Sequence, residues 1–167
     1  MDQRQLTEAA QALQDACRAR KISVSVAESL TAGLVGSTLA EISGASSYFR
    51  GGVICYTDQV KVDVLNVALL TIEERGAVSR KCAKEMVRGV NKLFDTKASV
   101  AVTGEAGPKS ASGKPVGRVW VAWSVGGQVD EKKFNFVGDR NEIRQQAAHV
   151  AISLLTDAIL NHPSAKL

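Results

Sequence analysis

Short apolar runs alternate with segments of helical periodicity along the first hundred residues. Strands are predicted where Val, Ile and small residues run together or alternate, at residues 22–26, 51–56 and 98–103. Helices are predicted where apolar residues recur every three or four positions, at about residues 4–20, after residue 33 to about 41, and at 79–94. Strands that alternate with helices form parallel sheets, because each crossover helix packs back onto the sheet. We therefore expect an α/β domain of three layers, with helices on both faces of one sheet.

The last third of the chain departs from this alternation. Residues 119–125 and 132–137 flank Gly126 and Gly127, which predicts a β-hairpin whose loop is longer than the tightest turns. One edge of the sheet should then be antiparallel. The predicted sheet is mixed and mostly parallel, with about five strands.

Two segments carry a capping residue three positions before a glutamate. The pairs are Thr71 with Glu74 and Asp139 with Glu142. This spacing is typical of a capping box, in which each side chain bonds the backbone of the other residue. We therefore predict a short helix that opens at Thr71 and a final helix that opens at Asp139.

Composition places the chain in an ordinary class. Its 167 residues, 45% hydrophobic and 23% charged, have the size and composition of a globular domain. No repeat or linker divides them, so residues 1–167 are predicted to form a single domain. The amino terminus has no signal-peptide pattern, and no segment approaches the roughly 18 apolar residues that span a membrane. We expect a cytoplasmic protein that binds no membrane.

Charge and cysteine usage exclude further classes. The net charge of +4 comes from 21 basic and 17 acidic residues spread along the chain, without the basic runs and interleaved aromatics of nucleic-acid-binding proteins. We therefore expect no nucleic-acid partner. Cys17, Cys55 and Cys82 are odd in number, widely spaced and set in apolar patterns, which favours reduced core residues. Their spacing predicts no metal site.

Polar residues follow each of the first three predicted strands. They occupy residues 27–33, 56–61 and 103–108. In an open α/β sheet, ligands bind beyond the carboxyl ends of the strands, where such loops and helix amino termini meet. We therefore expect the functional cleft at this edge.

Ser29 and Thr31 lie at the predicted entry to a helix, where backbone N–H groups face an anion or a developing oxyanion. Both hydroxyls can equally serve as helix caps. With only His149 and His162 in the chain, and no Gly-x-Ser-x-Gly motif, a Ser–His–Asp site is poorly supplied.

A lysine can replace histidine as the base, as in Ser–Lys hydrolases. Lys61 follows Tyr56 by five residues, Tyr56 ending a predicted strand and Lys61 lying in the next turn. Both side chains can then point into one cleft. A solvated lysine and a core tyrosine are the structural alternative.

The segment 103–108 can approach a phosphate through its backbone, because Gly104 and Gly107 leave room and permit unusual dihedral angles. Residues 107–114 resemble a P-loop only in part. The spacing is Gly-x5-Gly-Lys, and Pro115 stands where Ser or Thr would bind magnesium, which excludes a nucleoside triphosphatase. Arg140, at the start of the final helix, can bind a phosphate or remain solvated.

Six short motifs occur in a fixed order along the chain. They are AESLTAG (27–33), GGVICY (51–56) with Lys61, GAVS (76–79), TGEAGP (103–108), KPVG (114–117) and GDR (138–140). Over about residues 5–160 the chain resembles the C-terminal domain of the competence/damage-inducible protein CinA, including its stand-alone nicotinamide-nucleotide amidases.

The resemblance implies that nicotinamide mononucleotide and water give nicotinate mononucleotide and ammonia, in pyridine-nucleotide salvage, without a metal or cofactor. It also implies a homodimer. Ser29 matches the nucleophile, and Tyr56 and Lys61 match the groups that handle its proton. Backbone N–H groups from Thr31 to Gly33 are then expected to form the oxyanion hole. The expected phosphate-binding residues are Thr103, Gly104, Gly107 and Arg140.

The sequence departs from the family pattern at the first and fourth motifs. Leu30 and Ala32 replace Cys and Gly, which leaves the nucleophile in place. Glu105 stands where relatives carry an apolar residue, and a carboxylate repels a phosphate unless it points away or meets a base. Two alternatives therefore remain, a non-catalytic nucleotide-binding module and a deamidase of another small carboxamide.

Overall fold

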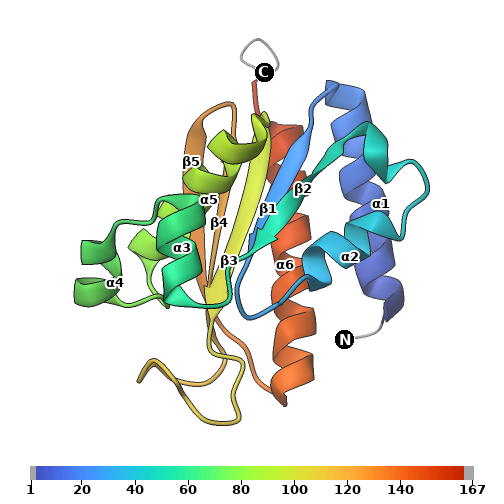
Figure 1. Ribbon diagram of the computed structural model, residues 1–167. Coiled ribbons are helices and arrows are strands. Elements are labelled where there is room, and N and C mark those ends of the chain that lie inside the picture. The colour runs from blue at the N-terminus through green and yellow to red at the C-terminus, as the bar shows by residue number, and fades with distance from the viewer. Residues whose placement is uncertain (1–2, 164–167) are drawn as a thin grey trace.

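Five strands form one mixed sheet in the computed structural model, which describes residues 3–163 (Figure 1). The strands are β1 (Val24–Glu28), β2 (Phe49–Ile54), β3 (Ala98–Gly104), β4 (Arg118–Val125) and β5 (Gln128–Asn135). Their order across the sheet is β2-β1-β3-β4-β5. Strand β1 is parallel to β2 and β3, whereas β4 is antiparallel to β3 and β5.

Helices cover both faces of the sheet (Figure 1). One face carries α1 (Gln3–Arg20), α2 (Leu34–Ala40) and α6 (Arg140–Asn161), and the other carries α5 (Arg80–Phe94) with α3 (Asp58–Leu65) packed on it. A short 3-10 helix η1 (Ala45–Ser47) precedes β2, and α4 (Leu69–Arg75) follows α3. The three-layer α/β prediction is confirmed. The assignment of residues 1–167 to one domain stays a prediction.

The central strands are buried on both faces, as parallel strands between two helical layers must be. In β1 every residue is buried: Val24 and Val26 pack in the cluster with α1 and α6, and Ala27 packs in the cluster with α5. The three cysteines lie free in these clusters, as predicted. Burial raises the pKa of Cys17 to about 12, and it is the largest influence on the raised pKa values of the other two thiols.

The hairpin turn is shorter than the sequence analysis predicted. Val125 pairs directly with Gln128, so only Gly126 and Gly127 form the turn. Their φ angles of 57° and 85° match a type I′ turn, which glycines adopt without steric cost and which suits the twist of the two strands. Strand β5 therefore begins four residues before the predicted run.

The two capping-box predictions had different outcomes. Asp139 accepts bonds from the N–H groups of Asn141 and Glu142, and its own N–H donates to Glu142, so the capping box of α6 is confirmed. The prediction at Thr71 was wrong, because α4 begins at Leu69. The hydroxyl of Thr71 instead donates to Glu85 Oε1, 2.9 Å away on α5.

Helix α3 was not predicted. Its valines Val60, Val62 and Val64 alternate with polar residues, a period-two pattern that favours a strand. The helix forms because Thr57 caps it, with its hydroxyl accepting the N–H of Val60. Lys61 therefore lies on a helix and not in a turn.

Candidate active site

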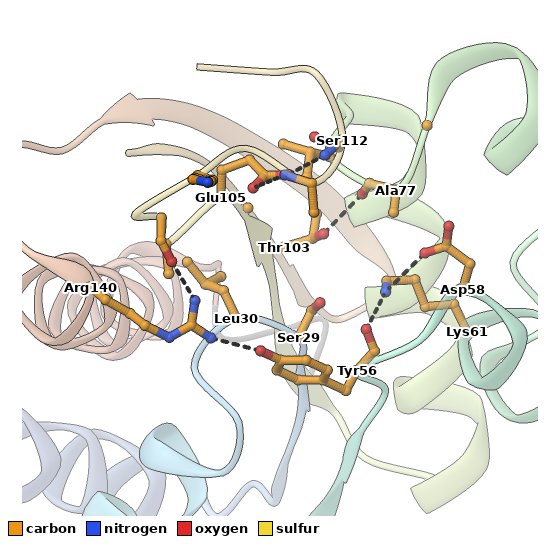
Figure 2. Close-up of a pocket in the computed structure, with 17 residues that line it drawn as sticks. Ser29, Leu30, Tyr56, Asp58, Lys61, Ala77, Thr103, Glu105, Ser112 and Arg140 are labelled. Atoms are coloured by element: carbon orange, nitrogen blue, oxygen red, sulfur yellow. Dashed lines mark hydrogen bonds and ion pairs between the residues drawn. The ribbon is translucent and has the colours of Figure 1, made fainter. Parts of the chain in front are cut away.

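A cavity of about 370 Å³ opens at the carboxyl ends of β1 and β3 (Figure 2). This is the edge at which the sequence predicted a cleft, and the volume lies in the range of small-molecule sites. Residues from five parts of the chain line it: Ser29 and Leu30; Tyr56, Asp58 and Lys61; Gly76, Ala77 and Val78; residues 103–107 with Lys109, Ala111 and Ser112; and Arg140.

Ser29 directly follows β1 and is fixed by the sheet. Its backbone N–H donates to the carbonyl oxygen of Val102 on β3, at 3.0 Å. The residue is 8% exposed and lines the cavity. Within residues 3–163 its hydroxyl makes no hydrogen bond, so it is free to meet a ligand.

Lys61 is 1% exposed and lines the same cavity. Its Nζ lies 3.4 Å from the carbonyl oxygen of Tyr56, and 3.5 Å from both the carbonyl oxygen of Thr57 and Asp58 Oδ1. Removing an ammonium from water is costly unless polar groups replace its hydration. Here three oxygens at the long limit of hydrogen bonding do so, and the one carboxylate among them is half exposed.

Tyr56 lies at the mouth of the cavity and is 53% exposed. Its phenol oxygen accepts a 2.7 Å bond from Arg140 Nη2, while Arg140 Nη1 donates to the carbonyl oxygen of Gly107 at 2.6 Å. The alternative of a solvated lysine and a core tyrosine is thus wrong for both residues. Lys61 is buried and Tyr56 is exposed.

Figure 2 shows Ser29 between Tyr56 and Thr103, with Lys61 entering from the α3 side. The side chains of Ser29, Tyr56 and Lys61 share the cavity but make no hydrogen bond with one another. The phenol of Tyr56 is bonded to Arg140 instead.

Thr31 and Gly33, predicted to supply oxyanion-hole N–H groups, are not among the residues that line the cavity. The N–H of Gly33 donates to Glu28 Oε2 at 3.0 Å, and the same carboxylate accepts from Val35 and Gly36. Thr31 is fully buried and its hydroxyl has no partner in the described part of the chain.

Leu30 supplies a backbone donor that the sequence analysis missed. It lines the cavity next to Ser29, and no described group accepts its N–H. A donor in the residue after a nucleophile is well placed to bind an oxyanion. The signal was present in the sequence only as the position after Ser29.

Thr103, Gly104 and Gly107 all line the cavity. The hydroxyl of Thr103 donates to the carbonyl oxygen of Ala77 at 2.9 Å, which joins β3 to the segment before α5. Gly107 has a φ of 79°, and a Cβ there would lie 2.6 Å from Val116 Cγ1. Its glycine is therefore required by the loop itself.

Glu105 is 7% exposed and faces the loop that follows it. Its carboxylate accepts the N–H groups of Ala111, at 3.1 Å, and of Ser112, at 2.8 Å. The carboxylate that the sequence left without a purpose is thus paired with two backbone donors.

Cations exceed carboxylates around the cavity. Lys61, Lys109 and Arg140 line it, against two carboxylates, Asp58 and Glu105, so the field favours an anionic ligand.

The described residues contain no group of three His, Cys, Asp or Glu side chains arranged to hold a metal ion. None of the helices within residues 3–163 is long and apolar enough to cross a membrane.

The model of the CinA C-terminal domain family matches residues 6–159. The chain belongs to this family. A putative competence-damage inducible protein of Bacillus velezensis is 44% identical to this CinA domain over 143 residues, which cover 86% of the chain but 34% of the relative. The chain thus spans about a third of the length of the curated relatives it matches.

Solved structures agree with this assignment. A CinA superfamily protein from Klebsiella pneumoniae superposes on the CinA domain with a TM-score of 0.91 at 30% identity, covering 94% of this chain and 99% of that one. A competence/damage inducible protein from Agrobacterium tumefaciens gives a TM-score of 0.87 at 35% identity, covering 94% and 96%.

Proposed function

We propose that this CinA domain is a metal-independent amidohydrolase that converts nicotinamide mononucleotide to nicotinate mononucleotide and ammonia. One observation carries the proposal: an unpaired serine hydroxyl, on Ser29, shares a cavity with a nearly fully buried lysine, Lys61. A serine hydroxyl and a lysine base in one site are the arrangement of serine–lysine hydrolases. Lys109 and Arg140, which line the cavity in addition to the proposed base, support a substrate with an anionic group.

In the first step, Ser29 Oγ attacks the carboxamide carbon, and its hydroxyl proton passes to Lys61, which acts as the base after it has released its own proton to solvent. The carbonyl oxygen becomes an oxyanion, which the N–H of Leu30 stabilises. The carbon–nitrogen bond then breaks, Lys61 returns the proton to the leaving nitrogen, and ammonia departs. Water attacks the acyl-enzyme in the same way and restores Ser29.

Tyr56 and Arg140 act at the mouth of the cavity. Tyr56 keeps its O–H proton for a relay to Lys61, because its phenol oxygen is the acceptor in the bond with Arg140. A guanidinium has five N–H donors, so Arg140 keeps donors for a phosphate beside its bonds to Tyr56 and Gly107.

We also propose that the domain acts as a homodimer in the cytoplasm.

The test is the release of ammonia and nicotinate mononucleotide from nicotinamide mononucleotide by metal-free protein. Ser29→Ala and Lys61→Met should each lower turnover by about 10³-fold or more, whereas the exposed controls Ser46→Ala and Lys92→Ala should not. Binding without turnover in the unmodified protein would favour a non-catalytic module. Faster turnover of another amide would make this protein a deamidase of that compound.

A further inference from the structure

The outer wall of the cavity is a segment without regular structure, residues 108–114, which we call the outer segment. Three of its residues, Lys109, Ala111 and Ser112, line the cavity. In the described chain, the hydrogen bonds that join this segment to the rest of the molecule are the two from Ala111 and Ser112 to Glu105. The place of this wall therefore depends on one carboxylate.

Glu105 is itself firmly held. Its backbone N–H donates to the carbonyl oxygen of Arg118 at 2.9 Å, and its carbonyl oxygen accepts the N–H of Gly117 at 2.8 Å. Its side chain is buried, and each carboxylate oxygen accepts one backbone N–H. Hydrogen bonds to a charged acceptor are about twice as strong as neutral ones, so this contact is a strong anchor for a short loop.

The outer segment lies across the cavity from the serine. Figure 2 shows Glu105 and Ser112 on one side, and Ser29 and Tyr56 on the other. A substrate whose amide is at Ser29 therefore extends its far end toward the outer segment. In a nicotinamide nucleotide that far end is the phosphate.

The charges agree with this orientation. Lys109 of the outer segment lines the cavity, and so does Arg140, which donates to the carbonyl oxygen of Gly107. The carboxylate of Glu105 offers the ligand little free negative charge, since both oxygens are engaged by the loop. Lys109 and Arg140 together outweigh the repulsion between Glu105 and a phosphate.

We infer that Glu105 is a specificity-determining residue, which fixes the outer segment so that Lys109 and Ser112 bind the phosphate of the nucleotide. The inference rests on the proposed function for the identity of the ligand. It gives a role to Glu105, the carboxylate that stands where the family pattern has an apolar residue.

The first readout is hydrogen exchange of single amides, which needs no turnover. The amides of residues 111 and 112 should be protected in the unmodified protein and exchange at least about tenfold faster in Glu105→Ala, because their acceptor is gone. Glu74→Ala, an exposed glutamate on α4, is the matched control and should leave them protected. Unchanged protection in Glu105→Ala would overturn the inference.

The second readout is ligand affinity in a Ser29→Ala background, where neither ligand is consumed. Glu105→Ala should weaken nicotinamide mononucleotide by about 5- to 20-fold and leave nicotinamide riboside, which lacks the phosphate, within twofold. Glu105→Gln, which keeps one acceptor and the side-chain volume, should give an intermediate loss and covers the case in which the alanine variant fails to fold.

The two hypotheses fail in different ways. Equal losses for nucleotide and riboside, or none for either, would overturn the role of Glu105 even if the enzyme is active. A second outcome is that Glu105→Ala weakens the nucleotide but not the riboside, while the unmodified protein shows no amidase turnover. This would support the role of Glu105 and refute the proposed reaction. If neither ligand binds, both are refuted.

Discussion

The ammonium nitrogen of Lys61 lies 3.4 Å from the carbonyl oxygen of Tyr56, while the phenol of that tyrosine is bonded to Arg140. The backbone of Tyr56 thus faces the proposed base, and its side chain faces the proposed phosphate-binding residue. One residue connects the two ends of the cavity. Its substitution should separate the proton step from the binding step.

We expect Tyr56→Phe to raise the KM for the nucleotide and to lower kcat by about tenfold, since the hydroxyl that holds Arg140 is lost. Lys61→Met should lower kcat by about 10³-fold or more, because the base itself is removed. Steady-state kinetics of the two variants measure the difference. A loss in Tyr56→Phe as large as that in Lys61→Met would mean that the phenol takes part in proton transfer directly.

Glu28 should be required for the stability of the loop that carries Ser29. Its buried carboxylate accepts three backbone N–H groups, of Gly33, Val35 and Gly36. We expect Glu28→Ala to lower the free energy of unfolding by about 3 kcal/mol, because buried donors lose their acceptor. Urea denaturation measures this, with the exposed Glu73→Ala as control. A loss no larger than that of the control would contradict the assignment.

The features that the sequence predicted are the local ones. The capping box joins Asp139 to Glu142, three positions later, and Ser29 follows directly on the apolar run of β1, so both could be found from neighbouring residues. The burial of Lys61 could not be found in this way. It depends on α3, whose alternating valines favour a strand, and on the packing of α3 against α5.

Two further contacts at the site join parts of the chain that the sequence gives no reason to pair. Arg140 and Tyr56 are 84 positions apart. Glu105 bonds backbone N–H groups six and seven residues away, in a loop without periodicity. Every residue except proline has a backbone N–H, so the sequence does not indicate which of these groups the carboxylate of Glu105 will bind. These partners are identified only in the folded loop.

Glu131 should make stability depend on pH. Burial opposes ionisation of this carboxyl group, but hydrogen bonds and charges from Lys84 and Arg80 outweigh it and lower its pKa below the usual value. A carboxyl group with a lowered pKa in the folded state stabilises fully above its unfolded pKa, and this stabilisation is lost as pH falls through the folded pKa.

We therefore expect the unfolding free energy to fall from neutral pH into the acid range, and the fall to be smaller in Glu131→Gln. Denaturant unfolding at a series of pH values from about 7 to 3 measures both curves. Parallel curves for the two proteins would show that Glu131 does not contribute to the acid loss. Lys132→Gln, whose exposed side chain lies outside this cluster, serves as the control for a change of charge on β5.

Gly89 should set the distance between α5 and α3, and with it the position of Lys61. A Cβ at Gly89 would lie 2.0 Å from the carbonyl oxygen of Leu65, the last residue of α3. Because backbone cannot yield to a side chain as a flexible residue can, Gly89→Ala should push α3 away from α5. We expect it to lower stability by about 1–3 kcal/mol, although alanine is the better helix former.

The same variant should lower kcat even when the protein is fully folded, because Lys61 moves with α3 while Ser29 stays in place directly after β1. Arg88→Ala, exposed on the same helix, is the control and should change neither property. The measurements are urea denaturation and amidase turnover under conditions in which both proteins are folded. A Gly89→Ala protein with full stability and full activity would show that α3 tolerates the displacement, and that the place of Lys61 does not depend on this contact.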